Sequence, residues 1–215
     1  DELGVELFER SRHGMHLTHE GKILEVYARR ALKEIENAKI ELTSSDGALE
    51  GTVNIGILAS LSELLSVSLM HVIKKKYPKV NVKITVGYSG HLKDWLENGE
   101  IDLALIYGSV SSKFLDLQPL VSEQLWLIGA YSSDLSEQKP IELKDMAAYD
   151  LILPYAPHRL RTLIEQGFHK AKYELKISAE VNDLNVQKQL VKEGFGFTIL
   201  PLVSIKNELK QNLFK

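Results

Sequence analysis

The sequence predicts an α/β protein in which a long helix precedes a domain of alternating strands and helices. From Gly51 onward, short apolar segments typical of strands alternate with segments whose apolar residues have helical spacing. The first three strand-like segments are separated by helix-like ones, an order that favours a parallel sheet with right-handed crossovers. Before this domain, residues 18–43 repeat apolar residues every three or four positions, which indicates one continuous helix.

Residues 1–17 are too short to form a domain of their own. Asp1 to Gly4 has the composition of a helix end that stops at a glycine, and the apolar residues that follow need a core. Gly14 lies within a short basic segment, so we expect the tip of a β-hairpin there. Because the chain begins within what reads as a helix, we also expect it to be a fragment of a longer protein.

The long helix carries a regular apolar stripe, and Thr18 is its predicted N-cap. From Leu24 onward the apolar residues are alternately four and three positions apart, the spacing of a seam between two packed helices. Tyr27 and Ile40 widen the stripe, so we interpret the helix as a spacer that also pairs with a second chain. The alternative is a helix that only packs along its own domain. The predicted dimerisation seam consists of Leu24, Ala28, Ala31, Ile35, Ala38 and Leu42.

The domain begins after a polar, hinge-like stretch at 44–47. In its first half we expect strands at 52–58, 80–86, 101–107 and 125–130, helices at 61–77 and 90–98, and a serine-rich loop at 108–113. In its second half we expect a helical turn at 143–147, strands at 151–153, 176–181 and 197–200, and helices at 159–172, 184–193 and 203–209.

Composition narrows the possible functions. With 215 residues, of which 44% are hydrophobic, the chain can bury a core in one or two compact units. A net charge of −3 argues against attraction of the whole surface to nucleic acid or an anionic membrane, so any such binding needs a local patch. The absence of cysteine excludes disulfides, thiolate catalysis and cysteine-ligated zinc. No apolar run approaches ~18 residues, so we expect no membrane span and a cytoplasmic location.

Sequence signatures of catalysis and of cofactor binding are missing. There is no phosphate-binding loop of the Walker type and no Gly-x-Ser-x-Gly nucleophile elbow. Gly194 and Gly196 precede a predicted strand, which is the wrong context for a dinucleotide-binding turn. His13, His16 and His19 straddle a turn and a helix start, so solvated surface is a simpler interpretation than a metal site. We therefore expect no enzyme activity, no cofactor and no metal.

Several motifs resemble the LysR-type transcriptional regulators. Residues 3–21 resemble the end of that family's DNA-reading helix and its wing: a glycine-ended helix, an apolar pair, Arg10, a hairpin tip at Gly14, and a Leu-Thr-x-x-Gly opening to the long helix. Residues 51–56 (GTVNIG) and 101–105 (IDLAL) resemble two strands of the family's sensor domain. Residues 193–201 (EGFGFTILP) resemble the strand that returns between its two lobes. Short phrases at 107–108, 118–120 and 153–154 also resemble the nitrogen-assimilation-control branch.

The resemblance implies a two-lobed, periplasmic-binding-protein-like (type 2) sensor domain, preceded by a linker helix and the remnant of a winged helix-turn-helix. Residues 1–17 would be that remnant, 18–46 the linker and dimerisation helix, and 51–215 the effector-binding domain. We place the first lobe at about 51–122 and 202–215, and the second at about 123–201. The family's first DNA-binding helices and its last strand and helix have no counterpart in this sequence.

The function implied by the resemblance is regulation of transcription by a small effector. Homodimers, assembling further into tetramers, are also implied. Arg10, Arg12 and His13 are the expected DNA contacts in the complete protein, with plain surface charge as the alternative. A solute-binding receptor without a DNA role and an enzyme are alternatives on the same architecture. The basic hairpin and the seam helix favour the regulator, because a free receptor needs neither.

Open α/β sheets bind ligands beyond the carboxyl ends of their strands, and in two-lobed folds this region faces the other lobe. The first strand ends just before Ser60 and Ser62, at a helix N-terminus that suits an anion. Tyr107 and Ser109 follow the third strand. For Ser60 the alternative is a structural role as helix cap, and for the arginines it is a solvated charge. The candidates from the second lobe are Gly129, Tyr155, His158, Arg159, Arg161 and Thr198.

Overall fold

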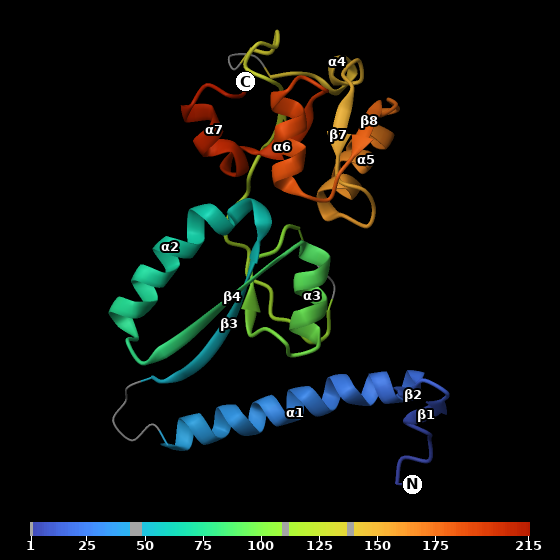
Figure 1. Ribbon diagram of the computed structural model, residues 1–215, viewed down its shortest axis with the longest axis vertical. Coiled ribbons are helices and arrows are strands. Elements are labelled where there is room, and N and C mark those ends of the chain that lie inside the picture. Colours follow the sequence, from blue (N-terminus) through green and yellow to red (C-terminus); the bar gives the residue numbers. More distant parts are fainter. Residues whose placement is uncertain (1, 44–48, 109–111, 137–139) are drawn as a thin grey trace.

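The structure is a computed structural model that describes residues 2–43, 49–108, 112–136 and 140–215. One long helix lies along the end of a first α/β lobe, and a second α/β lobe lies at the opposite end of the first (Figure 1). The hinge-like stretch expected at 44–47 and the predicted site residue Ser109 lie outside the described residues. No helix in the described ranges is long and apolar enough to cross a membrane.

A β-hairpin precedes the long helix. β1 (Phe8–Ser11) pairs antiparallel with β2 (Gly14–Leu17), and Ser11 lies opposite Gly14 at the turn. Gly14 has a φ of +119°, a conformation that favours glycine, so the predicted hairpin tip is confirmed.

The long helix, α1 (His19–Thr43), is fixed to this hairpin at its first turn. Thr18 is its N-cap, as predicted, because Thr18 Oγ1 accepts a hydrogen bond of 3.0 Å from Gly21 N. The same hydroxyl donates to Glu6 O at 2.7 Å. A Cβ atom at Gly21 would collide with Leu7 O, so only glycine allows the hairpin segment to approach the helix this closely.

The first lobe contains a three-stranded parallel sheet in the order β4-β3-β5, which confirms the predicted topology. The strands are β3 (Gly51–Leu58), β4 (Val80–Gly87) and β5 (Leu103–Ala104), and the crossover helices are α2 (Ala59–Lys76) and α3 (Ser89–Glu97). The predicted strand 101–107 is shorter than expected. β5 lies at the edge of the sheet and pairs only with β3, which leaves Leu103 47% exposed.

The second lobe combines antiparallel and parallel pairs. β6 (Leu125–Ile128) runs antiparallel to β9 (Thr198–Pro201), and β7 (Leu151–Leu153) runs parallel to β8 (Ile177–Glu180). A bridge between Leu151 and Phe197 joins the two pairs. The helices of this half of the chain are α4 (Leu143–Met146), α5 (Arg159–Ala171), α6 (Leu184–Lys192), the 3₁₀ turn η1 (Leu202–Ile205) and α7 (Lys206–Lys210).

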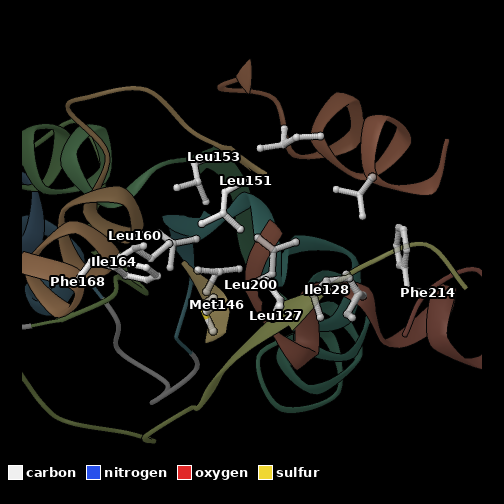
Figure 2. Close-up of a cluster of buried hydrophobic side chains, with 14 residues drawn as sticks. Leu127, Ile128, Met146, Leu151, Leu153, Leu160, Ile164, Phe168, Leu200 and Phe214 are labelled. Carbon is white, nitrogen blue, oxygen red and sulfur yellow. The ribbon is translucent and has the colours of Figure 1, made fainter. Parts of the chain in front are cut away.

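The larger hydrophobic core belongs to the second lobe (Figure 2). The three residues of β7 are completely buried within it, between the neighbouring strands and α5. Ile205 and Phe214 are buried in the same core, and Gly129 exchanges backbone hydrogen bonds with Lys215. We expected residues 202–215 to belong to the first lobe. This expectation is wrong for Ile205, Phe214 and Lys215, which pack with the second lobe.

Candidate functional site

A cavity lies between the two lobes, beyond the carboxyl ends of β3, β4 and β5. Its volume is about 50 Å³, and the empty space reaches about 540 Å³ once the open solvent at its mouth is included. The first lobe contributes the beginnings of α2 and α3 and the residue Tyr107. The second lobe contributes the loop after β7, the beginning of α5, and residues that follow β8. The polar residues in its lining are Ser60, Tyr88, Ser89, Tyr107, His158, Arg159, Asn182 and Gln187.

The first-lobe wall of the cavity presents four hydroxyl groups among the described residues, those of Ser60, Tyr88, Ser89 and Tyr107. Ser60 Oγ lies 3.5 Å from Tyr107 Oη, and Tyr107 Oη donates to Glu123 Oε2 at 3.0 Å. Ser89 Oγ accepts a hydrogen bond of 3.1 Å from Tyr107 N. Burial raises the pKa of Tyr107 to about 12, so its phenol stays protonated and remains the donor to Glu123 near neutral pH.

The first turn of α2 has no side-chain cap. Its N-cap residue is Leu58, whose side chain cannot accept a hydrogen bond, so the alternative role of Ser60 as the helix cap is wrong. The first backbone N–H groups of α2 therefore remain available at this end of the helix. Ser62 does not line this cavity: its hydroxyl donates to Ala59 O at 3.0 Å and borders a neighbouring one.

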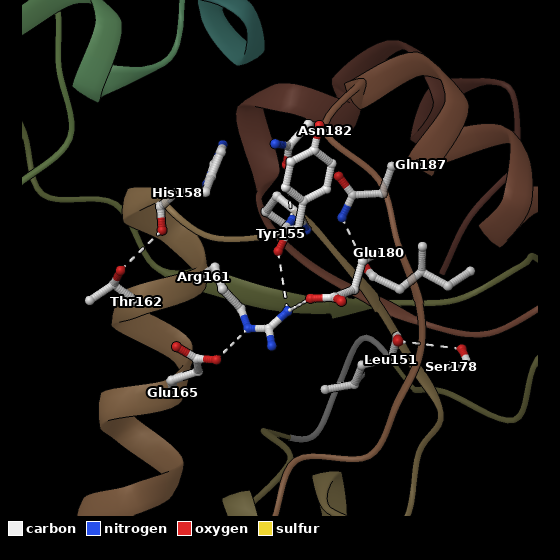
Figure 3. Close-up of polar contacts among 12 residues, drawn as sticks. Leu151, Tyr155, His158, Arg161, Thr162, Glu165, Ser178, Glu180, Asn182 and Gln187 are labelled. Carbon is white, nitrogen blue, oxygen red and sulfur yellow. Dashed lines mark hydrogen bonds and ion pairs between the residues drawn. The ribbon is translucent and has the colours of Figure 1, made fainter.

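Two arginines near the start of α5 have different surroundings. Arg161 is bound on three sides: to Glu165 at 2.7 Å, to Glu180 at 2.8 Å and to Pro154 O at 3.2 Å (Figure 3). Arg159 has no ion pair with any described residue, and it lines the cavity. Its guanidinium lies against Gly108 of the first lobe, where an added Cβ would be 2.8 Å from Nε. Of these two arginines, Arg159 is the one without an ion pair among the residues that the structure describes.

His158 connects the two lobes at the cavity wall. Its Nδ1 accepts a hydrogen bond of 3.2 Å from Leu160 N and so caps α5. Its ring contacts the ring of Tyr88 edge-on, with 4.8 Å between centroids. Burial lowers the pKa of His158. Because Nδ1 is an acceptor, the bonding pattern assigns a neutral imidazole with its proton on Nε2.

Gln187 is a buried polar residue at the second-lobe wall, and it is only 3% exposed. Its Nε2 donates to Ile152 O at 3.0 Å and to Thr198 Oγ1 at 2.6 Å. Thr198 is 1% exposed and does not line the cavity. Thr198 thus lies behind Gln187 and holds its amide in place.

The structure brings together some of the predicted effector residues and separates others. Ser60, Tyr107, His158 and Arg159 line the cavity, whereas Ser62, Gly129, Tyr155, Arg161 and Thr198 do not. Gly129 packs against Phe197 on the far side of the lobe, which corrects its assignment. Tyr155 is 51% exposed in the loop after β7.

Sequence reasoning missed Tyr88, Ser89, Asn182 and Gln187. Tyr88 and Ser89 follow the end of β4, and Asn182 follows the end of β8. The rule about carboxyl ends of strands would have found these three, had it been applied to these strands as well as to the first and third. Gln187 offers no such signal, since its spacing within α6 is that of an ordinary helix position.

The two faces of α1 have different surroundings. One face packs on the first lobe: Lys33 Nζ lies 2.9 Å from Asp102 Oδ1, and the Arg30 guanidinium lies 4.2 Å from the ring centroid of Phe114. The predicted seam lies on the other face, where Leu24 is partly buried and Ala28, Ala31, Ile35, Ala38 and Leu42 are exposed. The helix therefore does pack along its own domain, but that contact leaves the seam uncovered.

The wing candidates lie on the hairpin. Arg12 and His13 form its tip, and Arg10 lies opposite Met15 in the ladder. All three side chains are exposed.

Comparison with protein families gives one match that covers most of the chain, the LysR substrate binding domain over residues 46–215. The chain belongs to this family. The recognised resemblance and the two-lobed fold are thereby confirmed. The family model describes the substrate binding domain alone, and the hairpin and α1 precede the residues that it matches.

Individual relatives agree with this assignment. The transcriptional regulator BbuR of Bordetella bronchiseptica is 30% identical over 92% of this chain, which spans 61% of BbuR. The nitrogen assimilation regulatory protein of Klebsiella aerogenes is 27% identical over 93% of this chain, which spans 65% of it. A protein of the nitrogen-assimilation branch is thus among the relatives, at lower identity than BbuR.

The fold of the LysR domain also matches solved structures. The effector binding domain of QuiR in complex with shikimate superposes with a TM-score of 0.66 at 22% identity, covering 74% of this chain and 77% of that domain. At this identity the likeness concerns the fold.

Proposed function

We propose that this LysR-family chain is the linker and sensor of a transcription regulator whose activity is controlled by a small anionic effector bound between the lobes. The complete protein would bind DNA through a winged helix-turn-helix of which the hairpin is the wing. BbuR and the Klebsiella protein are named regulators, which supports this class. A cytoplasmic location belongs to the same proposal, because DNA and metabolites are both accessible there.

The observation that carries the proposal is the position of Arg159. This arginine comes from the second lobe, lies against Gly108 of the first, and has no described ion-pair partner at the cavity. A bound anion would pair with Arg159 while meeting Ser60 and the uncapped start of α2. The ligand would thereby join the two lobes, which is how binding could be converted into a change of lobe arrangement.

A thermal-shift screen of small carboxylic acids tests the effector site. We expect at least one acid to raise the melting temperature of the chain, since a ligand that binds only the folded state stabilises it. The shift should be lost in Arg159→Gln and kept in Arg12→Gln, a matched control on the distant hairpin. Equal shifts in both variants would contradict the site.

Pairing through α1 is the second part of the proposal. The exposed seam of α1 is apolar and regular, and the first lobe packs on the opposite face of the helix. We propose that a second copy of α1 covers it, with dimers assembling further into tetramers. Sedimentation of the chain at micromolar concentrations measures this directly.

DNA contact by Arg10, Arg12 and His13 is proposed for the complete protein only. A contact to phosphate strengthens binding to all sequences alike and steepens its salt dependence, whereas a contact to a base edge changes sequence choice. Filter binding of the complete protein at several salt concentrations should show a flatter salt dependence for Arg12→Ala. An unchanged slope would assign Arg12 to plain surface charge.

A receptor without a DNA role is the less favoured alternative. It would need neither a basic hairpin nor an uncovered helical seam, and both are present. Nothing in the described cavity favours catalysis either: its polar groups do not form a nucleophile-base pair, and the described residues hold no cluster of potential metal ligands.

A further inference from the structure

We propose, resting on the function proposed above, that the interlobe cavity binds a monocarboxylic acid whose apolar body carries a hydroxyl group. The polar groups of the cavity wall divide into those with partners and those without. The groups without partners define where a charge, a hydrogen-bond donor and an apolar body can sit.

The charge of the ligand follows from Arg159. Among the described residues that line the cavity, Arg159 is the one arginine or lysine, and no aspartate or glutamate is present. One guanidinium can pair with one carboxylate in a two-point contact. A dicarboxylate or a phosphate dianion would leave a second negative charge between the lobes without a partner, which is unfavourable away from water. A single negative charge therefore fits best.

The carboxylate end belongs at the first-lobe wall. Ser89 Oγ already accepts from Tyr107 N, so its O–H is left to donate, and Ser89 is only 7% exposed. Tyr107 gives its own proton to Glu123, so Ser60 Oγ is the donor in its contact with Tyr107 Oη, and at 3.5 Å this weak bond can be exchanged for one to a carboxylate. These donors lie on the lobe that Arg159 reaches through its contact with Gly108.

The hydroxyl end belongs at Gln187. The Gln187 amide is fixed, because Ile152 O can only accept and therefore requires the nitrogen on its side. The other amide atom, Oε1, receives no hydrogen bond from any described residue, and it is not among the fully buried atoms without a partner, so it is open to the cavity that Gln187 lines. An unpaired acceptor in a largely apolar wall favours a ligand that brings a donor, and an alcohol provides one while a second carboxylate does not.

The space between these two ends is apolar. The wall there consists of aliphatic side chains from both lobes, so a hydrocarbon ring or branched chain would lose little on leaving water. These side chains are Leu58, Leu160, Val181, Leu184 and Leu200.

Isothermal titration with four matched probes tests the assignment on the unmodified chain. The probes are 3-hydroxycyclohexanecarboxylate, cyclohexanecarboxylate without the hydroxyl, 3-hydroxycyclohexanecarboxamide without the charge, and cyclohexane-1,3-dicarboxylate with two charges. We expect the hydroxy acid to bind tightest, roughly tenfold more tightly than each of the others, the effect of one well-placed hydrogen bond or charge contact.

Two variants test whether Gln187 is the residue that makes the cavity prefer an acid with a hydroxyl group. Gln187→Met removes the acceptor, and Thr198→Val removes a partner of the same amide from behind without changing the cavity wall. The preference for the hydroxy acid over the plain acid should disappear in Gln187→Met and persist in Thr198→Val. If Gln187→Met does not fold, the four-probe comparison on the unmodified chain decides.

Two results would overturn the inference. Equal binding of the hydroxy acid and the plain acid, or tighter binding of the dicarboxylate, would refute the ligand class while leaving an anionic effector site in place. Failure of all four probes and of every acid in the thermal-shift screen would refute the proposed function itself, and this inference with it.

Discussion

Arg159 of the second lobe lies against Gly108 of the first, so closely that a Cβ atom at Gly108 would be 2.8 Å from Arg159 Nε. Gly108 also has a φ of +73°, which favours glycine. The contact joins the end of one lobe's sheet to the start of the other lobe's helix, across the cavity. It brings together two residues that are 51 positions apart in the numbering (159 − 108).

Gly108→Ala should therefore affect binding more than stability. The positive φ costs about 1 kcal/mol of the free energy of unfolding, and the flexible Arg159 side chain can move away from the new methyl group. Acids that stabilise the unmodified chain should produce a smaller melting-temperature shift in Gly108→Ala. An undiminished shift would mean that the position of Arg159 beside Gly108 is irrelevant to binding.

Arg161 should behave in the opposite way to Arg159. Its side chain is 11% exposed and bonds Glu165, Glu180 and Pro154 O, so Arg161→Ala leaves these partners unsatisfied. Because both glutamates are half exposed, we expect a loss of about 2 kcal/mol rather than the larger cost of a fully buried pair. Urea denaturation of the two variants measures this. A stability loss in Arg159→Ala equal to that in Arg161→Ala would contradict the distinction.

The ion pair between Lys33 and Asp102 should fix α1 to the first lobe only weakly by itself. Both side chains are partly exposed, so Lys33→Ala should cost no more than about 1 kcal/mol. Asp102→Ala should cost more, because Asp102 Oδ2 also accepts a hydrogen bond of 2.7 Å from Asn54 N. A double-mutant cycle of thermal melts separates the pair from the second bond. Equal losses in the two single variants would argue against this division of roles.

The seam of α1 predicts self-association. Ile35→Glu or Ala31→Glu would place a charge in a buried helix pair, at a cost of several kcal/mol to the dimer. Glu34→Gln, beside the seam, is the matched control and should leave the sedimentation coefficient unchanged. A monomeric unmodified chain at high micromolar concentration would refute pairing through α1.

His158 predicts a pH dependence of stability. Its pKa is lowered in the folded chain, so the unfolded chain binds the proton more readily. This contribution to stability is complete above the ordinary pKa near 6.5 and is lost as the pH falls below that value. Protonation would also remove the acceptor that caps α5 and add a positive charge beside Arg159.

His158→Asn isolates this effect, because asparagine can still cap the helix but does not titrate in this range. Between pH 7.5 and 5.5 the melting temperature of the unmodified chain should fall more than that of His158→Asn. Parallel curves would show that His158 does not contribute to the pH dependence.

Much of the fold could be predicted because local patterns and tertiary context agree. Parallel strands separated by helices determine the first lobe, and the turn at Gly14 and the cap at Thr18 have local signatures. The length of β5 could not be predicted, because the number of neighbouring strands decides it. The placement of Phe214 in the second core depends on a pairing with Ala130 that has no local signal.

The candidate site was predictable where it follows strand ends and unpredictable where it depends on helix rotation. Ser60 and Arg159 lie in the first turns of α2 and α5, and Tyr107 follows β5, all at the cavity edge. Gln187 and Thr198 are hydrogen-bonded to each other, but only Gln187 lines the cavity. The packing of α6 against β9 decides which of the two side chains does so. Ser60 and Ser62 both lie in the first turn of α2, but only Ser60 lines the cavity.

The pair Ser60 and Ser62 therefore provides the most direct test of an anion site between the lobes. The measurement is calorimetric titration of the unmodified chain, Ser60→Ala and Ser62→Ala with 3-hydroxycyclohexanecarboxylate. Our account predicts that Ser60→Ala binds about tenfold more weakly, because it loses a hydrogen bond to the carboxylate, and that Ser62→Ala binds as the unmodified chain does. Undiminished binding by Ser60→Ala, or an equal loss in Ser62→Ala, would contradict it.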